Sequence, residues 1–217
     1  MKIAILCDTH CGIRNSSEVF LDNAEDFYTN IFFPECQKQG ITQILHLGDY
    51  YDHRKFVNFK ALNQNRRVFL DQLRKNNMTM DIIPGNHDTY YKNTNELNSL
   101  KECLGHYMNE IHIVMEPTVM QYGSLSMGLL PWICADNYDQ SMNFIRDCKA
   151  DWLGSHLELS NFEIGRGIMA HSGMDPKLFQ KFEQVLSGHY HTASRRDNIW
   201  YLGNPMEFFW SDAHDPK

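Results

Sequence analysis

Three apolar runs in the first half of the chain each stop directly before a cluster of polar residues that can bind metal ions. The runs cover 2–7, 41–47 and 78–83, and the clusters behind them are Asp8-Thr9-His10, Gly48-Asp49-Tyr50-Tyr51-Asp52 and Gly85-Asn86-His87-Asp88. A buried strand that ends in an active-site loop has this pattern. Because open α/β sheets bind ligands at the carboxyl ends of their strands, we predict a sheet whose loops form one site.

Helical spacing separates these runs and extends beyond them. The sequence predicts helices over 18–39, 59–76 and 93–108, so that successive strands are joined in β-α-β units and run parallel. Further on, it predicts short strands over 111–114, 118–121 and 125–130 and a helix over 137–149. We therefore expect an α/β fold with a second sheet packed on the first, as a four-layer helix-sheet-sheet-helix sandwich.

Composition limits the class of protein. With 217 residues and 42% hydrophobic content, the chain can bury the core of one domain over 1–217. It has no apolar signal region and no stretch near the about 18 apolar residues of a membrane span, so we expect a cytoplasmic protein without membrane contact. The six cysteines form no C-x-x-C pair and are expected to be reduced.

The formal net charge of −7 differs from that of a generally basic nucleic-acid binder. Several of the acidic residues are candidate metal ligands, however, and two divalent cations would offset their charge. Basic residues lie near the proposed loops, and most of them are read as solvated surface charges. These are Arg14, Arg54, Lys55, Arg66, Arg67, Arg195 and Arg196.

A fourth cluster, Gly188-His189-Tyr190-His191, completes the set of donors. Two histidines spaced this way in an extended segment seldom serve packing. Taken alone, Asp8-Thr9-His10 is equally consistent with a helix cap, and Gly85-Asn86-His87-Asp88 with a turn. Together the clusters supply carboxylate, amide and imidazole donors, which can hold two divalent ions that share a carboxylate. The sequence thus predicts a two-metal phosphoesterase site, while His46, His106 and His112 are read as structural.

The order D-x-H, G-D-x-x-D, G-N-H-D, a lone His and G-H-x-H resembles the calcineurin-type metallophosphoesterase superfamily from Asp8 to His191. Within it, the chain is most similar to DNA-repair nuclease subunits of the SbcD and Mre-eleven type, and among these to the recombination nucleases of T-even-type phages. The pointers are Leu130-Pro131-Trp132-Ile133 and the segment from Gly188 to Pro205. Asp52 departs from the histidine of cellular Mre-eleven proteins and matches SbcD; His53 either replaces that histidine or is a surface residue.

The resemblance implies a role for each motif residue. Asp49 would bridge two metal ions, His87 would contact the scissile phosphate and help to protonate the leaving oxygen, and Asp88 would orient His87. The further histidine ligand is His156 or His171; His171 follows an apolar run like a strand end, but the context of His156 and its distance from His189 favour His156. The ion ligands would be Asp8, His10 and His191 for one ion and Asn86, His189 and His156 for the other.

The resemblance also implies a DNA nuclease that uses two Mn²⁺ ions, with Mg²⁺ or other divalent ions as substitutes. Its activities would be 3′-to-5′ exonuclease on duplex ends and endonuclease on single strands, in recombination and double-strand break processing. The partner would be an SMC-like, SbcC-type coiled-coil ATPase, bound through a segment that we expect to be absent here, as is the DNA-capping domain. If the source is a phage, the location is the host cytoplasm.

Family members also form homodimers, and helices 59–76 and 93–108 would supply the contact here. Candidate contact residues are Phe56, Phe59, Leu62, Val68, Phe69 and Leu97. Two alternatives stay open: another dinuclear-metal phosphoesterase, either a protein phosphatase or a small phosphodiesterase, and a non-hydrolytic scaffold for the ATPase. The complete ligand set together with His87 argues against the scaffold.

Overall fold

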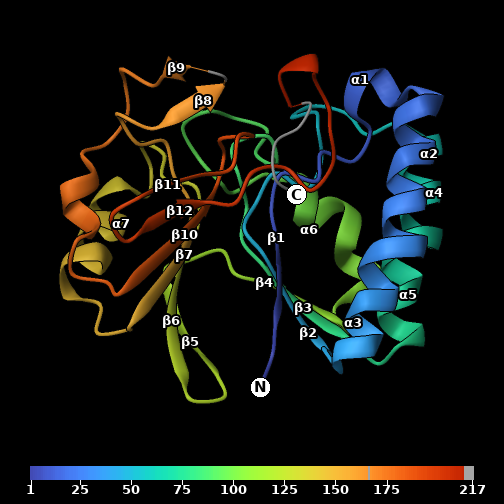
Figure 1. Ribbon diagram of the computed structural model, residues 1–217, viewed down its shortest axis with the longest axis horizontal. Helices are drawn as coiled ribbons and strands as arrows, with labels where there is room; N and C mark the ends of the chain where they lie inside the picture. The colour runs from blue at the N-terminus through green and yellow to red at the C-terminus, as the bar shows by residue number, and fades with distance from the viewer. Residues whose placement is uncertain (166, 213–217) are drawn as a thin grey trace.

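The computed structural model describes residues 1–165 and 167–212 and arranges them in four layers, helices, sheet, sheet and helix (Figure 1). This confirms the predicted sandwich. The first sheet is fully parallel and has the strand order β1-β2-β3-β4. Its strands are β1 (Ala4–Leu6), β2 (Gln43–His46), β3 (Thr79–Ile82) and β4 (Ile111–Ile113). β4 thus belongs to this sheet, although the sequence placed it among the short strands of the second half.

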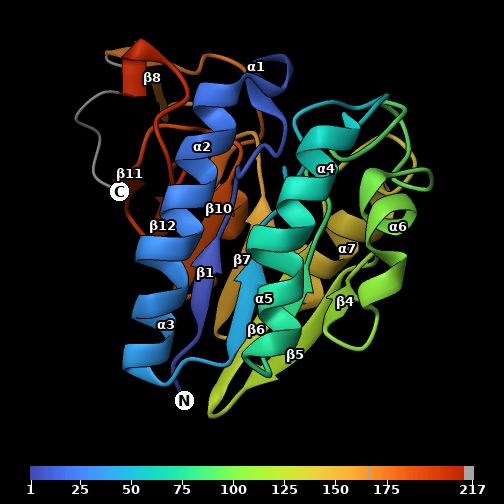
Figure 2. The same cartoon turned by 90° about the vertical axis from the view of Figure 1, so that its right-hand side faces the viewer.

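Two long helices cover the outer face of the first sheet (Figure 2). One runs through α2 (Glu18–Asp26), a π-helical segment (Phe27–Phe32) and α3 (Phe33–Gln39), and the other through α4 (Phe59–Asn65), a second π-helical segment (Arg66–Leu70) and α5 (Asp71–Lys75). Both confirm the predicted helices. A short α1 (Ile13–Ser16) precedes the first of them.

The third predicted helix begins later than expected. α6 (Ser99–Leu104) and a 3₁₀ turn (Gly105–Tyr107) occupy its second half, whereas 93–98 is irregular. The reason is Asn98, whose side-chain oxygen accepts a hydrogen bond from the amide of Lys101 at 3.0 Å and so caps the helix there.

Successive side chains along the strands point to opposite faces of the first sheet, so the hydrophobic core has two parts. Ile44 in β2 faces the helices, whereas Leu45 and the following Leu47 face the second sheet, and all three side chains are fully buried. In β3, Met80 and Ile82 face the helices in the same way. This period of two is what a strand covered on both faces requires.

The second sheet has the order β11-β12-β10-β7-β6-β5, with a parallel centre and antiparallel edges. α7 (Tyr138–Asp147) and a 3₁₀ turn (Pro176–Phe179) belong to its outer side, where Ile145 packs with Leu153 and Val185 (Figure 1). The strands are β5 (Thr118–Tyr122), β6 (Leu125–Leu130), β7 (Trp152–His156), β10 (Gln184–Gly188), β11 (Ser194–Arg196) and β12 (Ile199–Tyr201). A ribbon of β8 (Glu163–Gly165) and β9 (Ile168–Met169) and a last 3₁₀ turn (Trp210–Asp212) complete the described elements.

Two further expectations concern membranes and thiols. In residues 1–165 and 167–212, none of the helices combines the length and the apolar character needed to cross a bilayer. All six cysteines are free thiols, as the sequence predicts.

Candidate metal centre

The site lies where the carboxyl ends of strands from both sheets meet. Asp8 follows β1, Asp49 follows β2, and His156 is the last residue of β7. Backbone bonds join the first two loops, because the amide of Asp8 donates to the carbonyl of Gly48 at 3.0 Å and that of His10 to the carbonyl of Asp49 at 3.1 Å. The two sheets therefore contribute to one constellation.

The first group of donors, cluster A, consists of Asp8, His10 and His191, whose ligand atoms lie within 4.8 Å of one another. The Nε2 atoms of His10 and His191 are 3.0 Å apart, and each is 3.9 Å from Asp8 Oδ1. Asp8 and His10 are buried. The amide of His189 donates to both carboxylate oxygens of Asp8 at 3.1 Å, which fixes the position of this carboxylate.

The second group, cluster B, consists of Asn86, His156 and His189. The side-chain oxygen of Asn86 lies 3.1 Å from His156 Nε2 and 2.8 Å from His189 Nδ1. His156 Nδ1 donates to the carbonyl of Leu47 at 2.8 Å, so its Nε2 points into the cluster, where it can bind a proton or a cation. A backbone partner of this kind orients imidazole ligands in metal sites.

Asp49 lies between the two clusters. Its Oδ2 is 3.8 Å from Nε2 of His10 in cluster A and 3.3 Å from Nε2 of His156, and its Oδ1 accepts a 2.7 Å hydrogen bond from the amide of His87. Asp49, His156 and His189 also form a donor group whose ligand atoms are within 4.8 Å of one another. Among the described residues, Asp49 is thus the carboxylate that borders both clusters.

Several of these residues have backbone angles that only glycine adopts readily. Asp8, His10, Asp49 and His189 have φ of 49°, 43°, 55° and 89°. Non-glycine residues at positive φ are uncommon, and such strain concentrates at functional sites. Here the loop hydrogen bonds of Asp8 and His10 hold the backbone in place.

Glycines border the clusters because the loops approach each other closely. A Cβ atom at Gly85 would lie 2.2 Å from Asp49 Oδ1, and one at Gly48, whose φ is +90°, would lie 2.7 Å from Gly85 Cα. No side chain fits at such distances. This explains why the second and third motifs both begin with glycine.

His87 is partly exposed beside the clusters, with its ring centroid 4.9 Å from that of His10. Its Nδ1 donates to the carbonyl of Asp52 at 2.6 Å. Asp88 has other partners: its carboxylate accepts hydrogen bonds from the amides of Gly85, Tyr50 and Tyr51 at 2.9 to 3.1 Å. The group that orients His87 is therefore the Asp52 carbonyl, whereas Asp88 ties two loops together.

The close approach of these buried acidic and imidazole groups shifts their pKa values. Burial favours the neutral form of Asp49, but the positive charges available on His156, His10 and His87 outweigh it and hold the pKa of Asp49 well below its usual range. Burial alone would lower the pKa of His156, yet the facing Asp49 raises it to about 9. Burial and the neighbouring His156 lower the pKa of His189 to about 3. Burial, with Asp49 nearby, raises the pKa of Asp88 to about 6.

The donor set fits divalent cations. Pairs of imidazole nitrogens converge on each other in cluster A and on one amide oxygen in cluster B, with carboxylates beside them. Lone pairs that point at a common space repel one another unless a cation or a proton lies between them. Mixed carboxylate, amide and imidazole ligands suit hard and borderline divalent cations rather than soft metals.

The remaining histidines differ in burial and in their distance from the clusters. His156 is fully buried in cluster B, whereas His171 is exposed at the surface. His53 is exposed and stacks on Phe56 with centroids 3.8 Å apart, which agrees with the surface interpretation. His46 is buried and its Nε2 is 3.0 Å from the Thr9 hydroxyl, outside both clusters.

Two residues near the clusters were not predicted as part of the site. Asp52 forms a third donor group with His10 and His87, its Oδ1 being 3.3 Å from His10 Nδ1. Trp132 packs against His189 and His156 with ring centroids 5.3 and 5.9 Å apart. The sequence marked both motifs, G-D-x-x-D and Leu-Pro-Trp-Ile, but spacing alone does not show which side chains reach the metal ligands.

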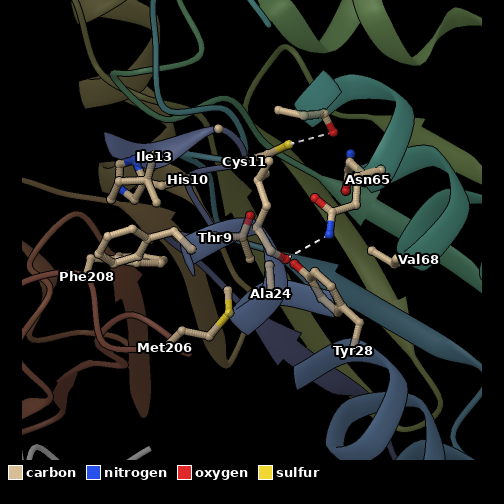
Figure 3. A pocket seen from close by; sticks show the side chains of 15 residues that line it. Thr9, His10, Cys11, Ile13, Ala24, Tyr28, Asn65, Val68, Met206 and Phe208 are labelled. Carbon is tan, nitrogen blue, oxygen red and sulfur yellow. Dashed lines mark hydrogen bonds between the residues drawn. The ribbon is translucent and has the colours of Figure 1, made fainter. Parts of the chain in front are cut away.

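A small cavity of about 30 Å³ lies behind His10 and is bordered by Tyr28, Asn65 and Met206 (Figure 3). It has room for about one or two water molecules. The ring of Phe208 packs edge-on against His10 with centroids 5.8 Å apart. The cavity thus belongs to the wall that supports His10 and is too small for a nucleotide.

Comparisons with known proteins agree with this geometry. Residues 1–193 match the calcineurin-like phosphoesterase family. Exonuclease subunit 1 of enterobacteria phage T4 is 30% identical over 217 residues, which are 100% of this chain and 63% of that protein. The chain therefore spans less than two thirds of this relative's length.

Two solved structures resemble the chain at low identity. GAP50, the anchor in the inner membrane complex of Plasmodium, is 14% identical, with 93% of this chain and 70% of that chain covered and a TM-score of 0.55. The Pseudomonas putida nuclease MPE is 15% identical, with 91% and 66% covered and a TM-score of 0.42. GAP50 supports the fold alone. From the sequence match over residues 1–193, the chain belongs to the calcineurin-like phosphoesterase family.

Proposed function

We propose that this chain is the nuclease part of a metal-dependent DNA nuclease that binds two Mn²⁺ ions. The observation that carries the proposal is the pairing of two complete donor clusters, with Asp49 between them and His87 at their open side. A two-ion site is suited to in-line displacement at phosphorus, and a proton donor beside it suits departure of an alkoxide.

In this proposal Asp8, His10 and His191 hold one ion, and Asn86, His156 and His189 hold the other. Asp49 contributes to both. Bound ions would neutralise charge on the phosphodiester and lower the pKa of a water that attacks it. Because Asn86 is neutral, its cluster binds a cation without adding a further carboxylate next to an anionic substrate.

His87 would serve as proton donor to the leaving oxygen. A carbonyl oxygen can only accept, so the bond from Nδ1 to the Asp52 carbonyl places the hydrogen of the neutral ring on Nδ1. Nε2 is then the atom that takes up and gives back the transferred proton. Asp52 thereby fixes both the tautomer and the ring orientation, and Asp88 supports the loop from behind.

The phage relative supports a nucleic acid as substrate and a partner subunit, because its name describes one subunit of an exonuclease; DNA is the substrate that we propose. We infer 3′-to-5′ exonuclease activity on duplex ends and endonuclease activity on single strands, in recombination and break processing in the host-cell cytoplasm. The partner would be an SbcC-type coiled-coil ATPase that binds outside this chain.

For the homodimer, the exposed side chains of Phe56 and Phe59, with exposed fractions of 58% and 86%, support a contact at the start of α4. Val68 and Phe69 do not, since both are buried in the core beneath that helix. The dimer proposal therefore rests on the amino-terminal end of α4.

The test measures cleavage of single-stranded and end-labelled duplex DNA with Mn²⁺, Mg²⁺ or a chelator, alongside the metal content of each protein. We expect Mn²⁺-dependent cutting by the wild type and a loss of about 10²- to 10⁴-fold in His87→Ser with both ions retained. His112→Ser is the matched control, because that side chain is 59% exposed and pairs with Asp81.

Other outcomes discriminate the alternatives. Hydrolysis of p-nitrophenyl phosphate without DNA cleavage by the metal-loaded wild type would favour a phosphatase. A metal-loaded protein that hydrolyses neither substrate would favour the scaffold and overturn the proposal.

A further inference from the structure

A cavity of about 320 Å³ opens directly beside cluster B, and His156 forms part of its wall. Its lining residues come mostly from the segment between β6 and α7 and from the end of β7, and α7 and β7 lie in the same half of the molecule (Figure 1). Its volume is in the range of small-molecule sites. The apolar and aromatic lining residues are Trp132, Ile133, Cys134, Tyr138, Leu157 and Met174.

Trp132 connects this cavity with the metal ligands. Its ring borders the cavity and also packs against His189, with the planes inclined by only 35°, and against the edge of His156. A ligand in the cavity would therefore lie within one aromatic ring of the ions that His156 and His189 would hold. This is the distance scale that separates a nucleotide's base from its own phosphate.

The wall of the cavity is built rigidly. The amide of Trp132 donates to the carbonyl of Pro84 at 3.0 Å, and its carbonyl accepts from the side chains of Asn95 at 2.7 Å and Asn137 at 3.0 Å. The side-chain oxygen of Asn137 also accepts from the amide of Cys134 at 2.8 Å. Such preorganisation reduces the entropic cost of binding.

The charge of the lining selects between a base and a phosphate. The lining contains no lysine or arginine, and its one carboxylate belongs to Glu158. A phosphate group would be repelled there. A nucleobase has a π-face that stacks on aromatic side chains and, in adenine, cytosine and guanine, an amino group that a carboxylate can accept from.

We propose that this cavity, the Trp132–Tyr138 pocket, receives the unstacked base of the nucleotide that adjoins the cleaved phosphodiester. The inference rests on the proposed nuclease function and adds to it a site for the base. Trp132 forms the inner wall next to cluster B, and Tyr138, half exposed at the first position of α7, forms the rim. Base recognition here requires a strand end or an unpaired strand, since a base stacked within a duplex cannot enter.

The experiment is an abasic scan of a short single-stranded oligonucleotide with a mapped cleavage position. Each residue around that position is replaced in turn by an abasic sugar, and kcat and KM are measured with Mn²⁺. We expect one position adjoining the cleaved bond to raise KM by about ten-fold in the wild type. More distant positions should leave KM within two-fold of the intact substrate.

The variants Tyr138→Ala and Ile133→Ala show whether the effect arises in the pocket. Combined, they should raise KM for the intact oligonucleotide and reduce the abasic penalty, because the base loses two of its contacts while Trp132 remains. Tyr138→Phe should behave like the wild type, since it keeps the ring. Val119→Ala, at an exposed position of β5, is the control for a mutation elsewhere.

Each outcome has one meaning. If no adjoining abasic position changes KM, or if the penalty persists unchanged in the double variant, the pocket does not bind the base and the inference is wrong. If the metal-loaded wild type cleaves none of the oligonucleotides, the intact one included, the nuclease function itself is wrong and the base site with it.

Discussion

Among single residues, Asp49 bears the most constraints. It has a φ of 55°, borders both donor clusters, and accepts the amide of His87 while a glycine backbone packs against its carboxylate. A shorter or longer side chain would break several of these relations at once. The position of the carboxylate is thus determined by its neighbours before any ion binds.

Most donors could be predicted because each stands within a few residues of the end of an apolar run. Asp8, Asp49 and His189 follow apolar runs or belong to a motif with regular spacing, so the sequence alone indicates where they lie in the fold. His156 and Asp52 were harder, because their roles depend on contacts between the sheets and with His10. The role expected for Asp88 was wrong in one respect, since its partners are backbone amides and not His87.

Replacing Gly85 by alanine should displace the loops of the site through a steric clash with Asp49. The added Cβ would lie 2.2 Å from Asp49 Oδ1, so Asp49 or the loop must move. We expect a loss of about 1–3 kcal/mol in the free energy of unfolding, measured in urea, and a lower Mn²⁺ content.

Gly105→Ala is the control. No atom lies within 4 Å of the Cβ that alanine would add there, and the φ of −56° at this position is helical. The change should therefore be neutral or stabilise the protein by about 0.4–1 kcal/mol. Equal effects of the two changes would contradict the steric argument.

At the scale of secondary structure, the period of hydrophobic residues predicted the strands and the two long helices. It could not tell that β4 joins the first sheet, because a buried strand looks alike in either sheet. Nor could it exclude a helix over 93–98. There the side chain of Asn95 bonds to the carbonyl of Trp132, a contact made 37 residues away that sequence periodicity does not contain.

Asn98→Ala should therefore destabilise more than an ordinary cap substitution. Asn98 is 1% exposed, accepts from the amide of Lys101 and donates to the carbonyl of Asn95 at 2.8 Å. Thermal or urea unfolding should show a loss of about 1–2 kcal/mol. The side chain of Asn58, the solvent-exposed cap of α4, accepts only from the amide of Lys60 among the hydrogen bonds of the described residues. Asn58→Ala should therefore cost about 0.5–1 kcal/mol. A larger cost at Asn58 than at Asn98 would argue against this explanation of the helix start.

His46 in β2 should make stability depend on pH. Burial lowers its pKa to about 3, whereas the unfolded chain has a value of about 6.5. Below pH 6.5 this histidine binds a proton in the unfolded chain but not in the folded chain. Its contribution to stability is therefore fully present above that pH and is lost as the pH falls towards 3. The loss attributable to His46 should be about 2 kcal/mol at pH 5 relative to pH 8.

The check compares wild type and His46→Gln in chelator across this range. The pH dependence should be shallower by that amount in the variant, while His106→Gln, an exposed change, should follow the wild type. Parallel curves for all three proteins would show that His46 does not titrate as described.

Over the whole molecule, the site joins two sheets whose facing sides are packed with apolar side chains such as Leu47 and Leu129. The hydroxyl of Tyr122 in β5 also donates a hydrogen bond to Asp81 in β3 at 2.8 Å. Cluster A takes Asp8 and His10 from the first sheet and His191 from the second. Cluster B takes Asn86 from the first and His156 and His189 from the second. Ions held there would act as crosslinks between the two halves.

Removal of metal should accordingly lower the melting temperature. An ion that binds only the folded state adds about 4 kcal/mol at a free concentration of 1,000 Kd, which for a chain of this size corresponds to a shift of about 10 °C. We expect Mn²⁺ to raise the transition seen in EDTA, by circular dichroism, in a concentration-dependent way. Asp49→Asn, which weakens the shared carboxylate, should shift much less; an identical shift in both proteins would place the ions elsewhere.

The division of each cluster between the two sheets has a consequence for synthesis on the ribosome. Neither cluster is complete until the end of the fourth motif has emerged from the exit tunnel, because cluster B needs His189 and cluster A needs His191. A nascent chain that has folded only its first sheet would present two of the three ligands of cluster A and one of the three ligands of cluster B. If the ions carry the activity, the growing polypeptide is inert until residues 188–191 have left the tunnel and joined the first sheet.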